Sequence, residues 1–170
     1  MKISHFFAYS SLLLVLASCA NTVELTTRFD ASQAAYILEQ GTGTIKGQAF
    51  LKTRGGDLKT AAGNMATLVP VTAYSTERFR AIYGDSKVTK LNANFKDTDP
   101  RYKDFIRQVS VDIEGRFTFT NVAAGNYYVT TSVIWEAPGY GGYLAQQGGA
   151  LYNNVSVEKG KTVEIILSGF

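Results

Sequence analysis

The side chains best suited to acid–base chemistry in this chain are four carboxylates in two closely spaced pairs. One pair is Asp97 with Asp99, and the other is Asp112 with Glu114. Paired carboxylates can hydrolyse a glycosidic bond, one as the acid and the other as base or nucleophile. Both pairs fall in segments that predict a polar loop or a hairpin turn, where solvated carboxylates are the ordinary alternative. Residues 97–99 also begin like a calcium loop, but the glycine and distal glutamate of such a loop do not follow.

The only cysteine of the chain, Cys19, ends the run Leu16-Ala17-Ser18-Cys19. The apolar segment before it is too short for a membrane-spanning helix, which needs about 20 apolar residues, and is typical of a signal peptide. The run resembles the lipobox of bacterial lipoprotein signal peptides. This resemblance implies that residues 1–18 are removed and that Cys19 carries a diacylglyceryl group and an N-acyl chain such as palmitate. Two or more acyl chains anchor a protein stably.

The residues around Cys19 also bear on its location. Ala20 rather than aspartate follows the cysteine, which in enterobacteria-like sorting points to the outer membrane. The alternative is an ordinary secretory signal cleaved near Ala17 or Ala20, with Cys19 incidental. An unpaired cysteine in an exported protein needs a reason, and lipidation supplies one. We therefore expect a lipid-anchored protein of the cell envelope, most simply at the outer membrane.

Export would also narrow the available chemistry. Removal of residues 1–18 leaves 152 residues, which is the length of one domain. It removes His5, the only histidine, and Lys2, so that the net charge falls from +3 to +2. Histidine-based triads and zinc sites then lack their residues, and we expect no metal, no cofactor and no enzyme activity. No stripe of Lys and Arg predicts binding to nucleic acid.

Two segments depart from a strand pattern. The polar residues 19–42 predict a lipidated tether with a short helix over residues 30–40. Residues 76–106 predict an insertion with a capped helix and a second helical turn. Its aromatic side chains are expected to pack on the rest of the domain: Phe79, Tyr83, Phe95 and Phe105. Insertions on rigid β scaffolds often carry specific function, the alternative here being a cover for a sheet edge.

The rest of residues 43–170 shows a hydrophobic period of two, which predicts strands. Pro70 has no amide donor and predicts an edge position or a bulge. Residues 138–149 predict a glycine-rich loop. About seven strands at this spacing predict an all-β fold, an antiparallel sandwich with a partly helical insertion. We expect them near residues 44–52, 64–74, 106–112, 116–121, 127–135, 155–157 and 162–167.

The central part of this pattern resembles a known family. Residues 115–119 read GRFTF and residues 121–129 read NVAAGNYYV. They are similar to the GxFxFxNVPAGxYxV run of carboxypeptidase regulatory-like domains, which are transthyretin-like β-sandwiches. Ala123 departs from the usual proline. The resemblance covers roughly two thirds of the chain after Cys19, excludes the 76–106 insertion and implies no peptidase centre.

The sequence leaves three hypotheses for function. The first is a non-catalytic structural or protein-binding module, with the membrane and envelope proteins as partners. The second is a glycan-binding lipoprotein in which Trp135, Tyr140 and Tyr143 stack on sugar rings. The alternative for these three residues is that Trp135 lies in the core and both tyrosines pack the glycine-rich loop. The third is a hydrolase that uses the carboxylate pairs.

Overall fold

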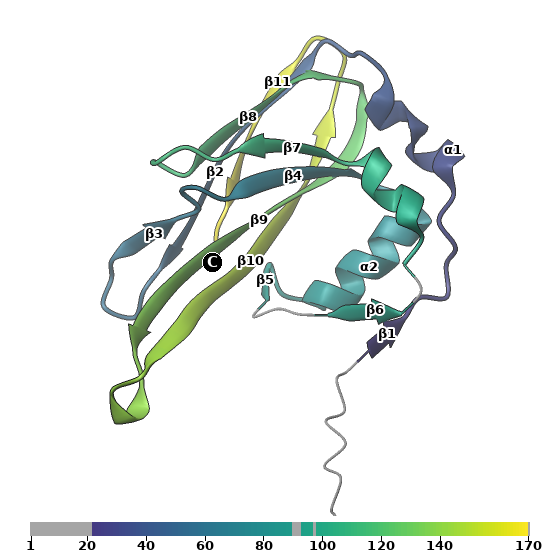
Figure 1. Ribbon diagram of the computed structural model, residues 1–170. Coiled ribbons are helices and arrows are strands. Elements are labelled where there is room, and N and C mark those ends of the chain that lie inside the picture. Colours follow the sequence, from purple (N-terminus) through teal and green to yellow (C-terminus); the bar gives the residue numbers. More distant parts are fainter. Residues whose placement is uncertain (1–21, 90–92, 97, 170) are drawn as a thin grey trace, which may run out of the picture.

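The protein is a sandwich of two β-sheets with helices against one outer face (Figure 1). The computed structural model describes residues 22–89, 93–96 and 98–169. Within them, no helix is both long enough and apolar enough to cross a membrane. The predicted all-β sandwich with a partly helical insertion is confirmed, with a few more strands than the seven expected.

The two sheets contain nine of the described strands. The five-stranded sheet has the spatial order β5 (Val88–Thr89), β10 (Leu144–Val157), β9 (Gly125–Pro138), β4 (Met65–Pro70) and β7 (Arg107–Ser110). The second sheet places β2 (Gly43–Lys52) between β11 (Thr162–Leu167) and β8 (Arg116–Val122), with β3 (Leu58–Thr60) on the C-terminal part of β2. The remaining elements are β1 (Thr22–Glu24), α1 (Ala31–Ala34), η1 (Ala35–Leu38), α2 (Ala73–Tyr83), β6 (Asn94–Lys96), η2 (Pro100–Phe105) and η3 (Tyr140–Gly142).

One pair of strands departs from the predicted antiparallel arrangement. Within the two sheets all neighbours are antiparallel except β2 and β11, which pair in parallel, with Ile45 opposite Val163 and Ala49 opposite Leu167. Side chains alternate between the faces of a strand whichever way its neighbour runs. The hydrophobic period therefore predicted both strands but not the direction of their pairing.

The core lies between the sheets and follows the predicted alternation. In β8, Phe117 and Phe119 are buried while the threonines beside them are exposed. In β9, every second residue from Tyr127 to Val133 is buried. On the inner face of β2, Ile45, Ala49 and Leu51 are buried. Burial of apolar surface at about 25 cal/mol per Å² makes this interior the main source of stability.

The corner between β8 and β9 is fixed by one buried tyrosine. Tyr127 is fully buried, and its hydroxyl donates a hydrogen bond to the carbonyl oxygen of Ala123 at 2.9 Å. Gly125 stands at this corner because a Cβ there would lie 2.6 Å from the ring of Tyr36. The Tyr36 hydroxyl in turn donates to the carbonyl oxygen of Asn126. Packing around this tight corner thus explains Gly125 and Tyr127 of the 121–129 run.

The predicted edge position holds for Pro70 itself but not for its strand. Strand β4 lies inside its sheet, between β9 and β7, rather than at an edge. Pro70 is its last residue, and the pairing with β7 has already ended at Leu68. A proline is tolerated there because no neighbouring strand needs its missing amide donor.

The glycine-rich loop predicted over residues 138–149 is also wrong in extent. Strands β9 and β10 pair from Gly125 opposite Val157 to Pro138 opposite Leu144, so the connection is much shorter than expected. Gly148 lies inside β10 with a φ of 89°. A Cβ there would lie 2.0 Å from the carbonyl oxygen of Val133. The glycine therefore permits a close approach between two strands in a segment that the sequence predicted to be a loop.

Helix α2 covers part of the outer face of the five-stranded sheet. Its residues Phe79 and Tyr83 form a second apolar cluster with Tyr128 of β9 and Tyr152 of β10. The rings of Phe79 and Tyr128 are stacked, with centroids 4.2 Å apart. The helix begins at Ala73, three residues before the predicted start, because Thr72 caps it by accepting a hydrogen bond from the amide of Ser75. The helix ends at Tyr83, with Gly84 as its C-cap.

The polar residues after position 21, predicted to form a tether, lie against the domain. Strand β1 pairs in parallel with β6. The Glu77 carboxylate of α2 accepts hydrogen bonds from the Thr26 amide and hydroxyl, each at 2.8 Å, and from the Thr27 amide at 2.7 Å. Asp30 caps the short helix α1 by accepting a hydrogen bond from the Ser32 amide, and its carboxylate also accepts one from the Gln33 side chain. The first described residues are therefore held on the domain by β6 and Glu77.

Protonation of Glu77 is expected to release this N-terminal segment. Its hydrogen bonds to Thr27 and Thr26 lower the pKa of Glu77 from its ordinary value of 4.5 to about 2. Because the folded pKa is the lower one, the stabilisation is complete above pH 4.5 and is lost as the pH falls through 2. In an NMR titration the Thr26 and Thr27 amide resonances should shift with a midpoint near pH 2. The shift should be absent in Glu77→Gln, and a midpoint near 4.5 would contradict the contact.

Candidate binding cleft

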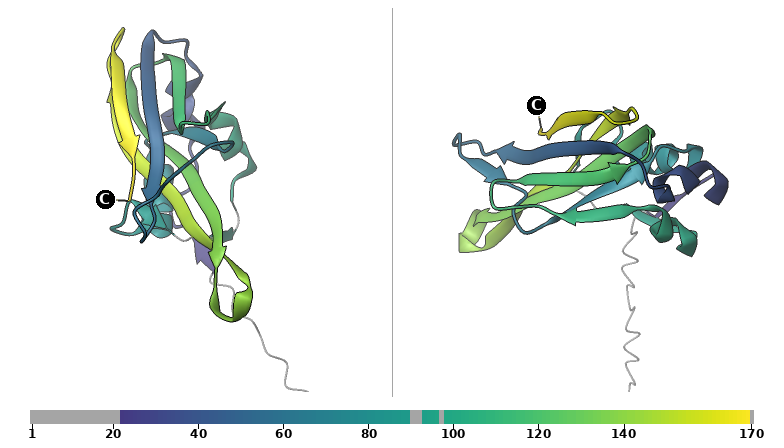
Figure 2. Two further views of the ribbon diagram at one scale, coloured as in Figure 1. Left: turned by 90° about the vertical axis from the view of Figure 1, so that its left-hand side faces the viewer. Right: turned by 90° about the horizontal axis from the view of Figure 1, so that it is seen from above.

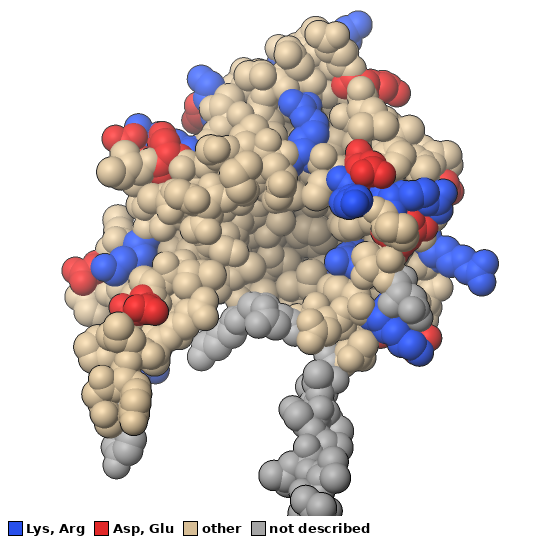
Figure 3. Space-filling view, viewed as in Figure 1, with Lys and Arg blue, Asp and Glu red and all other residues tan. Residues whose placement is uncertain are grey.

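A cleft of about 370 Å³ lies beside α2 on the outer face of the five-stranded sheet. The space-filling view shows this face hollowed over the sheet, with charged side chains gathered to its right (Figure 3). The helix, the sheet, β6 and η2 all contribute to its lining. The residues around it are Thr67, Val69, Arg78, Phe79, Ile82, Tyr83, Thr89, Ala93, Phe95, Tyr102, Ile106, Thr130 and Ala150.

Arg78 is the one charged residue among these described lining residues. Its guanidinium carbon lies 4.0 Å from the ring centre of Phe95, 4.9 Å from that of Tyr102 and 5.7 Å from that of Tyr74. A guanidinium over aromatic faces is attracted by their quadrupoles, so the rings hold the cation in place. One Arg78 N–H points to the Thr98 hydroxyl at a long 3.5 Å. The planar fork carries five N–H donors, so this contact uses few of them.

Two tyrosines of the cleft remain neutral over the physiological range. Burial raises the pKa of Tyr102 to about 12, against a smaller opposing effect of the Arg78 charge. Burial likewise raises the pKa of Tyr83, whose hydroxyl is 2.8 Å from that of Thr130. Both tyrosines therefore present neutral O–H groups and apolar ring faces. Together with Arg78 they favour a compact apolar group that bears a negative charge.

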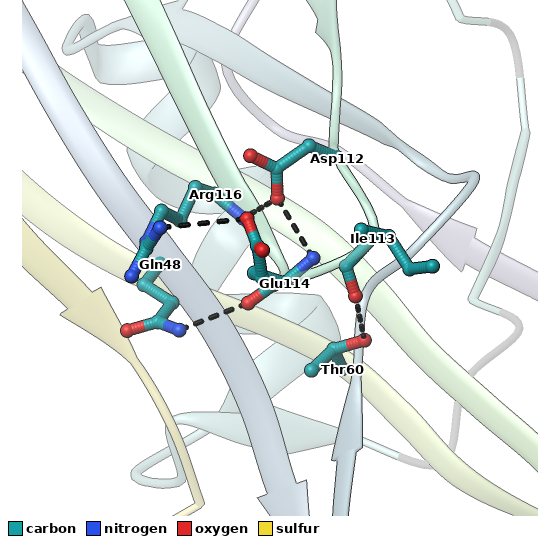
Figure 4. A network of polar contacts seen from close by, with 6 residues as sticks. All are labelled: Gln48, Thr60, Asp112, Ile113, Glu114 and Arg116. Atoms are coloured by element: carbon teal, nitrogen blue, oxygen red, sulfur yellow. Dashed lines mark hydrogen bonds and ion pairs between the residues drawn. The ribbon is translucent and has the colours of Figure 1, made fainter.

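The second carboxylate pair predicted from the sequence lies in the turn between β7 and β8. The Asp112 carboxylate accepts hydrogen bonds from the backbone amides of Glu114 at 2.9 Å and Arg116 at 2.7 Å (Figure 4). The Glu114 carboxylate lies 3.4 Å from the Arg116 guanidinium, and the Glu114 carbonyl accepts from Gln48 at 2.9 Å. These contacts give both carboxylates a role in forming the turn.

Of the other predicted pair, only Asp99 is among the described residues. Asp99 caps η2 by accepting from the Arg101 amide at 2.9 Å, and it pairs with the Arg101 guanidinium at 2.8 Å. These interactions hold the pKa of Asp99 below its ordinary value. Asp97 lies outside the described residues, as do Cys19 and the predicted signal peptide. No three His, Cys, Asp or Glu side chains in the described part of the chain gather closely enough to hold a metal ion.

The aromatic residues proposed for glycan stacking lie along the β9–β10 hairpin. Trp135 is half-buried and packs against the core, and a Cβ on Gly148 would lie 2.8 Å from its ring. Tyr143, in contrast, is 79% exposed near the end of the hairpin. The side chain of Tyr140 is outside the described part. Among described rings, neither Trp135 nor Tyr143 makes an aromatic contact.

Arg78 was not among the residues predicted from the sequence. Phe79, Tyr83 and Phe95 were predicted to pack the insertion, and Phe79 and Tyr83 of α2 are buried. One signal was present, because Tyr74 and Arg78 are four residues apart and so share a helix face. The rings of Phe95 and Tyr102 come from segments that only the tertiary structure brings to the same place.

Comparison with known proteins supports the fold. No protein-family model matches the sequence, and no curated protein matches it. The structure is similar to that of a Pseudomonas aeruginosa protein provisionally named a carbohydrate-binding protein, with a TM-score of 0.70 and 24% identity over 84% of this chain and 98% of that one. A minor pilin of Streptococcus agalactiae matches with a TM-score of 0.35 and 16% identity, over 77% of this chain and 46% of that one. At these identities the first likeness concerns the fold, which is a β-sandwich.

Proposed function

We propose that this chain is a lipid-anchored, non-catalytic binding module of a bacterial cell envelope. In this proposal Cys19 carries the lipid and holds the domain at the outer membrane, and envelope proteins are its partners. The lipobox-like run supports the anchor, and the β-sandwich supplies a rigid scaffold. The described carboxylates at positions 99, 112 and 114 serve in caps and turns, which favours binding over hydrolysis.

We also propose that residues 43–170 form a carboxypeptidase regulatory-like domain. The inward aromatic residues of β8 and the tight corner at Gly125 support this assignment. So does the buried Tyr127, whose hydroxyl bonds back to Ala123. A tyrosine of this kind, near the start of a strand and bonded to the preceding backbone, is a feature of sandwich corners.

The observation that carries the binding function is the cleft beside α2. Its volume of about 370 Å³ falls in the range of about 300–1,000 Å³ that ligand clefts have. Its walls are mainly apolar and aromatic, with Arg78 as the charged residue among those described. We propose that an envelope protein inserts an apolar side chain beside a carboxylate here, and that this carboxylate pairs with Arg78.

A photo-crosslinking amino acid at position 82 tests this function in intact cells. Ile82 lines the cleft, so a bound partner would lie within reach of the probe. The matched control is the same probe at Ile113, which is 82% exposed in the β7–β8 turn. A discrete adduct with an envelope protein from position 82 and not from 113 is expected. Absence of an adduct from position 82 in the lipidated protein would contradict the proposal.

Replacement of Arg78 should weaken the binding of that partner. A charge-assisted hydrogen bond contributes about 1.5–3 kcal/mol, so Arg78→Ala should reduce the yield of the adduct by about tenfold or more. Arg78→Lys keeps the charge but loses the planar fork, and should retain an intermediate yield. Thermal unfolding of each variant gives the stability control. An unchanged yield in folded Arg78→Ala would show that the cation does not recognise the partner.

A glycan is the second candidate ligand. Two observations favour it: the exposed Tyr143 on the hairpin, and the provisional name of the Pseudomonas aeruginosa protein that shares this fold. Trp135 is the only tryptophan, so its fluorescence reports on the hairpin. A saturable change with peptidoglycan fragments or envelope polysaccharides, lost in Tyr143→Ala, would support this candidate. An unchanged signal across these glycans would count against binding there.

A further inference from the structure

The far part of the β9–β10 hairpin projects from the sandwich as a two-stranded arm (Figures 1 and 2). Strand β4 pairs with β9 only as far as Thr130, and β5 pairs with β10 only at Ala150 and Leu151. We call residues 133–149 the arm, because in the described structure these parts of β9 and β10 pair only with each other. Its outer edges present backbone N–H and C=O groups that no other described strand uses.

The end of the arm combines exposed apolar side chains with an absence of charge. We call residues 141–144 the tip. Tyr143 is 79% exposed and Leu144 is 66% exposed. The sequence contains no Asp, Glu, Lys or Arg from residue 137 to residue 157, and the described atoms at the tip are uncharged in Figure 3. The nearest charged residue along the arm is Glu136, which is paired with Gln146 well behind the tip.

The position of β1, the first described strand, indicates which surface the tip faces. In Figure 1 and in the left view of Figure 2, the arm and β1 both lie at the lower end of the molecule, and the view from above shows them on different sides of it. Thr22 is three residues after Cys19, so these two residues lie at most about 11 Å apart. Because β1 is paired with β6 and Glu77 binds Thr26 and Thr27, the position of Thr22 on the domain is fixed.

We infer that the tip, through Tyr143 and Leu144, contacts the phospholipid surface in which Cys19 is anchored. This inference rests on the lipid anchor of the proposed function. A short connection at β1 holds that end of the domain against the bilayer, and the arm points the same way. Tyrosine and leucine suit the boundary between headgroups and acyl chains. The open strand edges limit the depth, because unpaired backbone groups are not tolerated in the hydrocarbon core. The tip therefore rests at headgroup level.

A single-cysteine labelling experiment tests this contact in the full-length protein. When Cys19 is lipidated its thiol is blocked, so the cysteine of Leu144→Cys is the only reactive one. The purified lipoprotein is labelled there with an environment-sensitive fluorophore and reconstituted into phosphatidylethanolamine–phosphatidylglycerol vesicles that contain nitroxide lipids. The matched control is Ile113→Cys, which replaces an exposed apolar residue in the β7–β8 turn, away from the tip (Figure 1). The label at 144 should be quenched several-fold more strongly than the label at 113.

Each outcome of this experiment decides a separate claim. Addition of Tyr143→Asp to the Leu144→Cys protein should reduce the quenching several-fold, because a charge disfavours the interface. Equal quenching at 144 and 113 in protein that floats with the vesicles would overturn the contact and leave the anchor intact. A label at 144 that is in water on vesicles but protected in whole envelopes would assign the tip to a protein partner instead. A wild-type protein with a reactive thiol and no incorporated fatty acid would overturn both anchor and contact.

Discussion

Replacement of Tyr127 with alanine is expected to lower the free energy of unfolding by about 3–5 kcal/mol, the cost of removing a large aromatic ring from a core. The ring is fully buried between the sheets and lies 5.2 Å, centre to centre, from the ring of Tyr36. The loss removes packing for both sheets and for η1 at once. Urea denaturation followed by circular dichroism measures the change.

Tyr127→Phe separates the two contributions of this residue. Phenylalanine keeps the ring and removes only the hydroxyl that donates to Ala123. A buried carbonyl that loses its partner costs about 1–3 kcal/mol, so this variant should lie between the wild type and Tyr127→Ala. If Tyr127→Ala costs less than about 1 kcal/mol, the corner does not depend on this ring in the way that its burial indicates.

Gly148→Ala is expected to destabilise the protein by about 2 kcal/mol or more, because it combines an unfavourable backbone conformation with a steric clash. The φ of Gly148 is 89°, and a Cβ there would lie 2.0 Å from the Val133 carbonyl oxygen. Backbone atoms cannot move aside without opening the β9–β10 pair. The emission of Trp135, whose ring lies over Gly148, should shift to the red as the base of the arm opens.

Gly142→Ala provides the matched control for that prediction. Gly142 has a similar φ of 81°, but no atom lies within 4 Å of a Cβ at this position. Its replacement should therefore cost only the left-handed conformation, about 1–2 kcal/mol, and leave the emission of Trp135 unchanged. Equal effects of the two substitutions would show that the clash with Val133 does not matter.

The sequence predicted the inner face of the sandwich well. The alternation in Phe117–Phe119 and in Tyr127–Val133 identified buried residues because successive side chains of a strand point to opposite faces. The short helix within residues 30–40 and the capped helix of the 76–106 segment could be predicted for a similar reason, since capping depends on a few neighbouring residues.

The errors have a different physical origin. Glycines 148 and 149 read as a loop because glycine usually marks turns, whereas here Gly148 permits a close approach to Val133 inside a long hairpin. The short strands β1, β3, β5 and β6 escaped notice because two or three residues carry no periodicity. The interior position of β4 could not be predicted from Pro70, because the sequence does not state where the neighbouring strand β7 ends.

The candidate cleft was the least predictable part of the molecule. From the sequence, the 76–106 segment was expected to pack on the sandwich through aromatic residues, but no role was predicted for Arg78. That role depends on Phe95 and Tyr102, which lie 17 and 24 residues further along the chain. No local pattern relates the three positions, because they converge only when α2, β6 and η2 pack together.

The sequence by itself determined which side chains face the interior, because strand alternation acts over a few neighbouring residues. Its lipobox-like run also predicted an anchor at Cys19, which the experiments above can test. Only the tertiary structure decided that Arg78 lies in an aromatic cleft and that the arm and β1 lie at the same end of the molecule. These relations join residues far apart in the chain, and they follow from how the sheets and helices pack.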